Sequence, residues 1–398
     1  MIAVYIIEYV FIAYLGFASL YIFVFGFAGL FGLKQKQKPI SKQRRFAVMI
    51  PGYKEDEVIV EVAREASQQN YPDDRFDVIV IADSFRADTL ASLRMLPIKV
   101  IEVSFESSTK SKALNKAMAQ LPEDYDVAVV LDADNIMEKD FLNKMNMAFE
   151  GEVYAVQGHR IAKNTNTSFA VLDAISEEIN NNIFRKGHRV LGLSAAIIGS
   201  GMGLRYLYFK NLMKNIHAIG GFDKEIELKM LKEGKIIEYL NHAYVYDEKV
   251  QKADVFSNQR RRWLSAQLHY FSKDFFTALK HLIKKGNIDY FDKAMQFIQP
   301  PRIMLLGILI IISILSVIFN PLYFTIIWLS ITAICILAFF FCIPTRFYNM
   351  KTLKALLTLP RGFLLMFGSL LKIRGANKKF IHTQHTSTEI DKNKTKTP

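Results

Sequence analysis

The pattern of apolar and polar positions divides the chain into segments typical of membrane helices and segments typical of a soluble domain. Three long apolar runs stand out, at residues 9–33, 303–319 and 322–343. The first is roughly 25 residues long, which is enough to cross a bilayer. A secretory signal is the alternative for this run, but no basic segment precedes it and no small-residue cleavage site closes it. We therefore expect a transmembrane helix within residues 1–33. Because only Asn320-Pro321 separates the other two runs, we expect a transmembrane helical hairpin within residues 302–343.

Residues 46–262 show a different pattern, in which short β-rich runs alternate with helical periodicity. Strands are predicted at residues 46–50, 77–82, 98–103 and 126–131. Fully apolar strands of this length, separated by helices, are typical of a mostly parallel sheet that is covered on both faces. The predicted fold class is therefore an α/β domain joined to about three membrane helices.

The remaining segments are less apolar. Residues 263–301 place phenylalanine and leucine among lysines, which predicts interfacial amphipathic helices that end at Pro300-Pro301. Residues 352–372 carry Lys354, Pro360 and Arg361, and a basic segment follows them. A fourth crossing would place that charge outside, so we interpret this stretch as an interfacial helix. The polar residues 383–398 are predicted to be disordered.

Composition supports a membrane protein with a basic inner face. The 398 residues are 51% hydrophobic and carry a formal charge of +13, an unusual combination for one soluble domain. The juxtamembrane linker 34–45 is densely basic, so the positive-inside rule places residues 46–262 in the cytoplasm and the protein in the inner membrane. Nucleic-acid binding is the other explanation of the charge, but the sequence shows no nucleic-acid motif. Cys335 and Cys342 lie in an apolar run, so they indicate neither a zinc site nor a disulfide framework.

Polar residues follow three of the predicted strands where each strand ends. Asp132 and Asp134 come directly after the fourth strand, and residues at i and i+2 of an extended chain point the same way. Such a pair suits a hard divalent cation, Mg²⁺ or Mn²⁺, that also binds diphosphate oxygens. Tyr53, Glu55 and Asp83 follow the first two strands, and the strand ends are expected to converge on one nucleotide. The alternative for each single residue is an ordinary turn or helix cap, and for Asp83 or Glu55 alone that is the preferred explanation.

Two further sequences carry candidate chemistry. Lys110 and Lys112 precede a helical pattern and are either phosphate contacts or surface lysines. Gln259-Arg260-Arg261-Arg262-Trp263 combines guanidiniums that pair with phosphate oxygens and an indole that offers a flat surface for a sugar ring. The alternative for this pentapeptide is a solvated basic patch with a core tryptophan.

Taken in order, these motifs resemble those of the membrane-bound family-2 glycosyltransferases, which include cellulose, chitin, hyaluronan and poly-N-acetylglucosamine synthases. The resemblance covers about residues 46–300. It implies an A-type glycosyltransferase fold, a UDP-sugar donor and a divalent metal on Asp132 and Asp134. It also implies an acceptor site, with Trp263 beside a loop that Gly199-Ser200-Gly201 resembles. The implied nucleotide-sugar contacts are Tyr53, Glu55, Asp83, Lys112, Asp132, Gln259, Arg260, Arg261 and Arg262.

The general-base motif departs from the family pattern. The family carries Thr-Glu-Asp-Leu-Glu-Leu, whose Asp is the base, whereas residues 223–228 of this chain are Asp-Lys-Glu-Ile-Glu-Leu. Aligning the two places Glu225 where the catalytic Asp belongs, and Asp223 is the rival. A glutamate has a similar intrinsic pKa and can accept the same proton. A surface helix with acidic residues in its first turn is the third explanation.

Two functions remain open from the sequence. The first is a processive synthase that extends a polysaccharide, which the Gln-Arg-Arg-Arg-Trp sequence favours. The second is transfer of one sugar to a membrane lipid, which the small number of spans favours, because about three helices cannot enclose a sugar-wide pore without a partner subunit or self-association. A non-catalytic relative is a third possibility, left open by the altered base motif.

Overall fold

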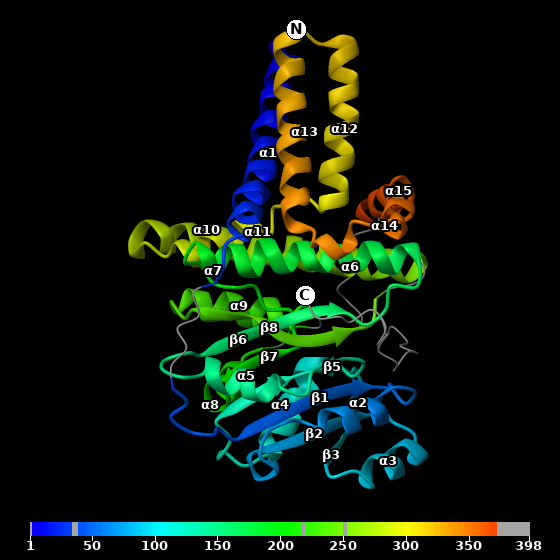
Figure 1. Ribbon diagram of the computed structural model, residues 1–398. Coiled ribbons are helices and arrows are strands. Elements are labelled where there is room, and N and C mark those ends of the chain that lie inside the picture. Colours follow the sequence, from blue (N-terminus) through cyan, green and yellow to red (C-terminus); the bar gives the residue numbers. More distant parts are fainter. Residues whose placement is uncertain (1, 34–38, 217, 219, 250–252, 372–398) are drawn as a thin grey trace.

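Upright helices stand on a layer of horizontal helices, and a sheet domain lies below that layer (Figure 1). The computed structural model describes residues 2–33, 39–216, 218, 220–249 and 253–371. The tail predicted to be disordered, residues 383–398, lies outside the described residues, as does part of the basic linker.

The sheet domain confirms the predicted α/β fold with a mostly parallel sheet. Its strands are β1 (Phe46–Tyr53), β2 (Phe76–Asp83), β3 (Lys99–Val103), β4 (Val127–Val130), β5 (Ile136–Met137), β6 (Ala155–Ala162), β7 (Met202–Arg205) and β8 (Ile237–Asp247). Their order is β3-β2-β1-β4-β7-β6-β8-β5, and β1 to β4 pair in parallel. Strand β7 runs antiparallel between β4 and β6, β6 pairs in parallel with β8, and β5 is antiparallel to β8. The four strands predicted from the sequence are β1 to β4.

Both faces of this sheet are covered, because alternate residues of each strand point to opposite sides. Phe46, Val48 and Ile50 pack into one core, whereas Ala47 and Met49 pack into the other. The covering elements are α2 (Ile59–Ala66), η1 (Asp73–Arg75), α3 (Ala87–Arg94), α4 (Lys110–Gln120), α5 (Phe141–Ala148), α8 (Tyr206–Met213) and α9 (Phe222–Lys232).

A layer of helices separates the sheet domain from the upright helices (Figure 1). It contains α6 (Ser168–Asn180), the π-helix η2 (Asn181–Gly187), α7 (His188–Val190), α10 (Ala253–Lys285) and α11 (Ile288–Gln296). Helix α10 begins at Ala253 and crosses the boundary predicted at residue 262. The Gln-Arg-Arg-Arg-Trp sequence is therefore part of the same helix as the amphipathic segment after it.

The upright helices are α1 (Ile2–Ala28), α12 (Arg302–Phe319) and α13 (Leu322–Cys342), and each is long and apolar enough to cross a membrane. They pack directly against one another, with Phe324 and Trp328 of α13 almost completely buried. Near the far end, the carboxylate of Glu8 accepts hydrogen bonds from Asn320 Nδ2 (2.6 Å) and Trp328 Nε1 (3.1 Å). These bonds tie α1 to the hairpin.

After η3 (Thr345–Phe347), helices α14 (Met350–Leu356) and α15 (Leu359–Leu371) follow. They are bent by 44° at the break between them, and by length and composition the pair is apolar enough to be one broken span or a re-entrant loop. In Figure 1 they lie beside the base of the upright helices, next to the horizontal layer. Most of residues 352–372 lie in these two helices, and the single interfacial helix expected there stays a prediction.

Candidate functional site

One cavity of about 1710 Å³ extends from the sheet domain to the membrane helices. At one end it is lined by residues at the carboxyl ends of β1 and β2 and just after β4, and at the other end by residues of α12 and α15. Strands β2 and β4 lie on opposite sides of β1, so the strand order reverses there. In open α/β sheets, ligands bind at the carboxyl ends of strands at such a switch point.

The ends of β1 and β2 form the first wall of the cavity. Tyr53 and Asp83 are register partners, and both line the cavity together with Glu55. The two residues that follow these partners, Lys54 and Ser84, have φ angles of 54° and 60°, which non-glycine residues rarely adopt. Backbone strain of this kind concentrates at functional sites. The structure therefore brings together the three residues that the sequence assigned to the nucleotide.

Asp132 and Asp134 follow β4 and both line the cavity. The ammonium of Lys110 contacts Asp132 Oδ1 and donates to the carbonyl oxygen of Gly199 at 2.7 Å. Asp134 is buried, and its carbonyl oxygen accepts a hydrogen bond from Lys163 Nζ at 2.7 Å. Among the described residues, no group of three or more His, Cys, Asp or Glu side chains is placed to hold a metal ion. Two carboxylates at a cavity wall nevertheless fit a hard divalent ion whose other ligands come from a bound diphosphate.

The glycine-serine-glycine loop does not present all three residues to the cavity. Gly199 lines it, whereas Ser200 is completely buried. Ser200 Oγ accepts a hydrogen bond from the backbone N–H of Asp132 at 2.9 Å. A Cβ atom on Gly201 would lie 2.8 Å from Val245, so this position is packed against β8. In contrast to the expectation of acceptor contacts, Ser200 and Gly201 shape the turn that carries Asp132.

Helix α10 turns the residues of the Gln-Arg-Arg-Arg-Trp sequence in different directions. Gln259, Arg262 and Trp263 have the i, i+3, i+4 spacing of one helix face, and all three line the cavity. Burial lowers the pKa of Arg262 below its usual value. Arg261 is not among the cavity-lining residues. The helix therefore directs Arg262 to the cavity and Arg261 away from the cavity lining, although the sequence grouped them together.

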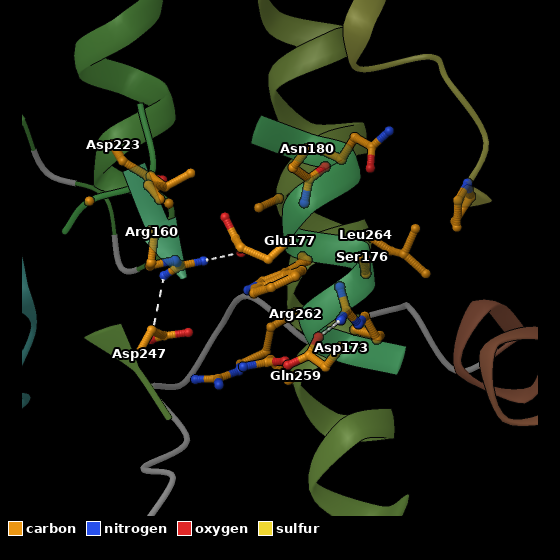
Figure 2. Close-up of a pocket in the computed structure, with 18 of the residues that line it drawn as sticks. Arg160, Asp173, Ser176, Glu177, Asn180, Asp223, Asp247, Gln259, Arg262 and Leu264 are labelled. Atoms are coloured by element: carbon orange, nitrogen blue, oxygen red, sulfur yellow. Dashed lines mark hydrogen bonds and ion pairs between the residues drawn. The ribbon is translucent and has the colours of Figure 1, made fainter. Parts of the chain in front are cut away.

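Arg260 reaches the cavity but is held by a partner that the sequence did not indicate. Its guanidinium forms an ion pair with Asp173 of α6 at 2.5 Å (Figure 2). The same guanidinium lies 4.4 Å from the ring centroid of Trp263 and covers one face of the indole. Arg260 therefore connects α10 to α6 and orients Trp263.

The two candidate bases lie in different surroundings. Asp223 lines the cavity, and a Cβ atom on Gly199 would lie 3.5 Å from its Cβ. Glu225 is not a cavity-lining residue, and its carboxylate forms an ion pair with Lys229 at 3.2 Å. Of Lys110 and Lys112, only Lys110 lines the cavity. The ammonium of Lys112 instead donates a hydrogen bond to the carbonyl oxygen of Ser107 at 2.8 Å. The geometry therefore favours Asp223 and Lys110 over the residues that the sequence placed first.

The far end of the cavity is apolar. It is lined by Ile303, Leu306, Gly307, Ile310 and Ile311 of α12 and by Leu359, Phe363, Leu364 and Met366 of α15. A Cβ atom on Gly307 would lie 2.4 Å from the ring of Phe363, so the glycine permits close approach of the two helices. An apolar groove is thus continuous with the polar end that contains Asp132 and Asp223.

Comparison with known proteins agrees with this arrangement. The sequence model of the family described as "Glycosyltransferase like family 2" matches residues 43–266, more than half of the chain. The chain belongs to this glycosyltransferase family. The chain is also similar to the beta-monoglucosyldiacylglycerol synthases of Trichormus variabilis and Synechocystis sp., with 24% identity to each over 231 and 230 residues. These alignments cover 54% of this chain and 47% and 46% of the relatives, so the chain spans about half the length of the curated relatives it matches.

Among solved structures, the mannosyltransferase PcManGT of Pyrobaculum calidifontis, in complex with GDP-Man and Mn²⁺, has a similar fold. The TM-score is 0.50 at 12% identity, and the alignment covers 90% of this chain and 98% of that one. The likeness shows that the A-type glycosyltransferase fold is shared over most of the chain.

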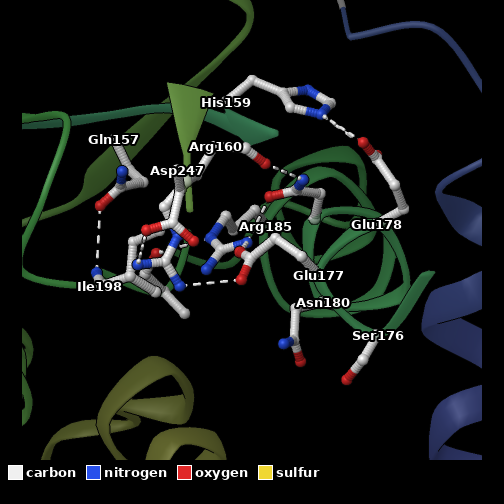
Figure 3. Close-up of polar contacts among 12 residues, drawn as sticks. Gln157, His159, Arg160, Ser176, Glu177, Glu178, Asn180, Arg185, Ile198 and Asp247 are labelled. Carbon is white, nitrogen blue, oxygen red and sulfur yellow. Dashed lines mark hydrogen bonds and ion pairs between the residues drawn. The ribbon is translucent and has the colours of Figure 1, made fainter. Parts of the chain in front are cut away.

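A network of buried charges supports the glycosyltransferase cavity on its membrane side (Figure 3). Arg160 pairs with Glu177 at 2.8 Å and lies 3.8 Å from Asp247, and Lys249 pairs with Asp247 at 2.6 Å. Burial acts to raise the pKa of Asp247, but Arg160 and Lys249 outweigh it and lower the pKa below its usual value. These carboxylates therefore stay ionised beside the cavity.

Sequence reasoning missed this network because its members are single charged residues in separate segments. The only sequence signal was that Glu177 and Glu178 interrupt an otherwise apolar helix face in residues 168–180. In the structure both are buried, and Glu178 contacts His159 and Arg346. Arg346 directly follows the membrane hairpin, so the network links α13 to the sheet domain.

Proposed function

We propose that this protein is a membrane-bound, inverting glycosyltransferase that moves one sugar from a UDP-sugar to a lipid acceptor. The observation that carries the proposal is the continuity of the cavity between Asp132 and Asp223 at one end and the groove between α12 and α15 at the other. A lipid lying in the groove places its hydroxyl at the sugar-transfer end while its chains remain in an apolar environment. The catalytic domain then works at the cytoplasmic face of the inner membrane, as the basic linker indicates.

The donor end supplies charge for the departing diphosphate. Asp132 and Asp134 would hold a divalent ion, Mg²⁺ or Mn²⁺, which neutralises developing negative charge when bound. Arg262 faces the same space, and Lys110 holds Asp132 against the Gly199 loop. Fixed positive groups of this kind stabilise a transition state in which the diphosphate gains charge.

Asp223 is the proposed general base. Its carboxylate takes the proton of the acceptor hydroxyl while that oxygen forms a bond to the anomeric carbon. The bond from the same carbon to the diphosphate breaks in the same displacement, which inverts the configuration. Gly199 lies next to both Asp223 and Lys110: a Cβ atom on it would be 3.5 Å from Asp223 Cβ, and its carbonyl oxygen accepts a hydrogen bond from Lys110, the partner of Asp132.

Two observations favour a single transfer over polymer synthesis. Helices α1, α12 and α13 pack directly against one another around Trp328, and the cavity opens between α12 and α15 instead. The curated relatives are glycolipid synthases by name, which supports a lipid acceptor. The processive synthase remains the second hypothesis, since Trp263 lines the cavity with 40% of its surface exposed and offers a sugar platform.

The test is to incubate membranes that contain the protein with radiolabelled UDP-sugars and to separate the products by solvent extraction. A lipid acceptor predicts label in the organic phase, on a product that carries one sugar. Water-soluble or insoluble polymer that grows with time would refute the single transfer.

A matched pair of variants tests the groove. Ile310 and Ile314 are both exposed on α12, but only Ile310 lines the cavity. Ile310→Trp fills the groove and should lower transfer to the lipid, whereas Ile314→Trp should leave the rate unchanged. Equal rates for both variants would remove the groove from the proposal.

A second pair tests the base. Asp223→Asn should reduce the transfer rate by about 10²–10⁴-fold, the usual contribution of a general base. Glu225→Gln, which breaks the ion pairs with Lys229 and Lys273, should retain most of the activity. The opposite ranking would assign the base to Glu225.

A further inference from the structure

Arg302 occupies the boundary between the polar and apolar ends of the cavity. It is the first residue of α12, and it lines the cavity together with Ser176 and Asn180 of α6. The next cavity-lining residues along α12 are Ile303 and Leu306, which belong to the apolar groove. A charged group at this depth lies where a membrane lipid changes from headgroup to hydrocarbon.

The contacts of Arg302 are to neutral groups. Its Nη1 donates to Asn180 Oδ1 at 2.5 Å, and its Nη2 donates to Ser176 Oγ at 2.8 Å. Within the described residues, no carboxylate lies at ion-pair distance from this guanidinium. Glu177 acts on Arg302 electrostatically but is already paired with Arg160 and Arg185.

Six other cationic side chains of the cavity are held by carboxylates of the protein. The pairs are Lys110–Asp132, Arg160–Glu177, Arg185–Glu177, Lys249–Asp247, Arg260–Asp173 and Lys293–Glu227. A partly buried guanidinium beside an apolar groove is unfavourable unless an anion accompanies it. Arg302 therefore differs from these cations in having room for a charged partner from outside the chain.

We propose that Arg302 binds the phosphate group of the lipid that occupies the groove, so that the acceptor is a phosphate-bearing lipid and not a neutral diacylglycerol. This inference rests on the proposed lipid-acceptor function. Guanidinium presents paired N–H donors that match phosphate oxygens. The positive end of the α12 dipole adds to the potential at the same place. The lipid chains then extend along Ile303, Leu306 and Ile310, and the remainder of the headgroup points toward Asp223.

The experiment measures lipid retention by the purified full-length protein in neutral detergent, using native mass spectrometry. The probes are dioleoylphosphatidic acid, dioleoylglycerol and inorganic phosphate. Wild type should retain phosphatidic acid about tenfold better than dioleoylglycerol, the effect of one charge-assisted contact. Arg302→Gln should lose this preference, and Arg302→Lys should restore part of it. Arg361→Gln is the control, because Arg361 is an exposed residue of α15 outside the cavity lining.

The outcomes separate this inference from the function beneath it. Equal retention of both lipids by wild type, or an unchanged preference in Arg302→Gln, would overturn the phosphate site and leave a lipid acceptor intact. Inorganic phosphate that displaces phosphatidic acid at equal concentration would also overturn it, because the site would then bind free phosphate. Retention of neither lipid would overturn both this inference and the lipid acceptor. Loss of preference in Arg361→Gln as well would show that surface charge, not Arg302, attracts the lipid.

Discussion

Replacing Ser200 with alanine distinguishes a residue that shapes the donor site from one that touches the acceptor. Ser200 is completely buried, and its hydroxyl hydrogen bonds with the backbone N–H of Asp132 (2.9 Å) and the side-chain amide of Asn135 (2.6 Å). Alanine removes the hydroxyl and leaves a largely enclosed N–H without its acceptor, which costs about 1–3 kcal/mol. Because that N–H belongs to Asp132, losing the hydrogen bond should disturb the positions of the Asp132 and Asp134 carboxylates.

If this whole free-energy cost appears as weaker binding of the donor, UDP affinity in the presence of Mn²⁺ should fall by roughly fivefold to 150-fold. UDP affinity is measured by isothermal titration calorimetry of the purified protein. A separate transfer assay measures the acceptor concentration that gives half-maximal transfer. That acceptor concentration should be unchanged in Ser200→Ala.

The control is Ser313→Ala, which removes a buried hydroxyl that contacts Thr332 (2.8 Å) within the membrane hairpin. It should lower thermal stability without changing UDP affinity. An equal loss of UDP affinity in both variants would indicate general destabilisation. Unchanged UDP affinity in Ser200→Ala, together with a raised acceptor requirement, would refute the positioning role and return Ser200 to the acceptor site.

The remaining predictions concern the metal, the arginines, the tryptophan and the topology. Asp134→Ala should abolish transfer and weaken UDP binding when Mn²⁺ is present, and EDTA should do the same to wild type; full activity in EDTA would contradict a metal-dependent mechanism. Arg262→Ala should weaken UDP binding about tenfold. Arg261→Ala should have little effect, because Arg261 does not line the cavity. Equal losses of UDP affinity in the two variants would show that facing the cavity does not decide which arginine binds UDP. Trp263→Ala should slow transfer without altering product size, and a shortened polymer would instead indicate a processive enzyme. A cysteine introduced at Asn320 should react with a membrane-impermeant reagent in intact cells while one at Lys210 stays protected, and labelling at Lys210 would place the catalytic domain outside.

Several features of the site depend on which face of a helix a residue occupies. The sequence reveals that face only when the start of the helix is known. Arg261 and Arg262 are adjacent in sequence, but a helix turns successive residues by about 100°. A helix that begins at Ala253 places Arg261 and Arg262 on different faces. The boundary predicted from the sequence lay after Arg262, so this difference was not foreseen. Asp223 and Glu225 differ for the same reason, since both lie in the first turn of α9 and only Asp223 faces the cavity.

The sequence by itself determined the first four strands and the polar residues at their ends. Strands β1, β2 and β4 are short apolar runs, and Tyr53, Asp83 and Asp132 stand at or directly after their carboxyl ends. It also determined the three helices apolar enough to cross a membrane, because hydrophobicity over that length is a local property. Signals of this kind lie within a few adjacent residues, so they can be recognised without knowing what packs against them.

Only the tertiary structure decided which residues share the cavity. Lys110 joins Asp132 to Gly199, Arg260 pairs with Asp173, and Arg302 contacts Ser176, which lies 126 positions earlier in the chain. The groove between α12 and α15 likewise depends on how two helices cross. Such contacts arise because burial brings distant segments together, and each segment alone shows only an ordinary charge or an ordinary apolar face. The groove between α12 and α15 is therefore a property of packing, whereas the polar end of the cavity is already present in the order of the strands.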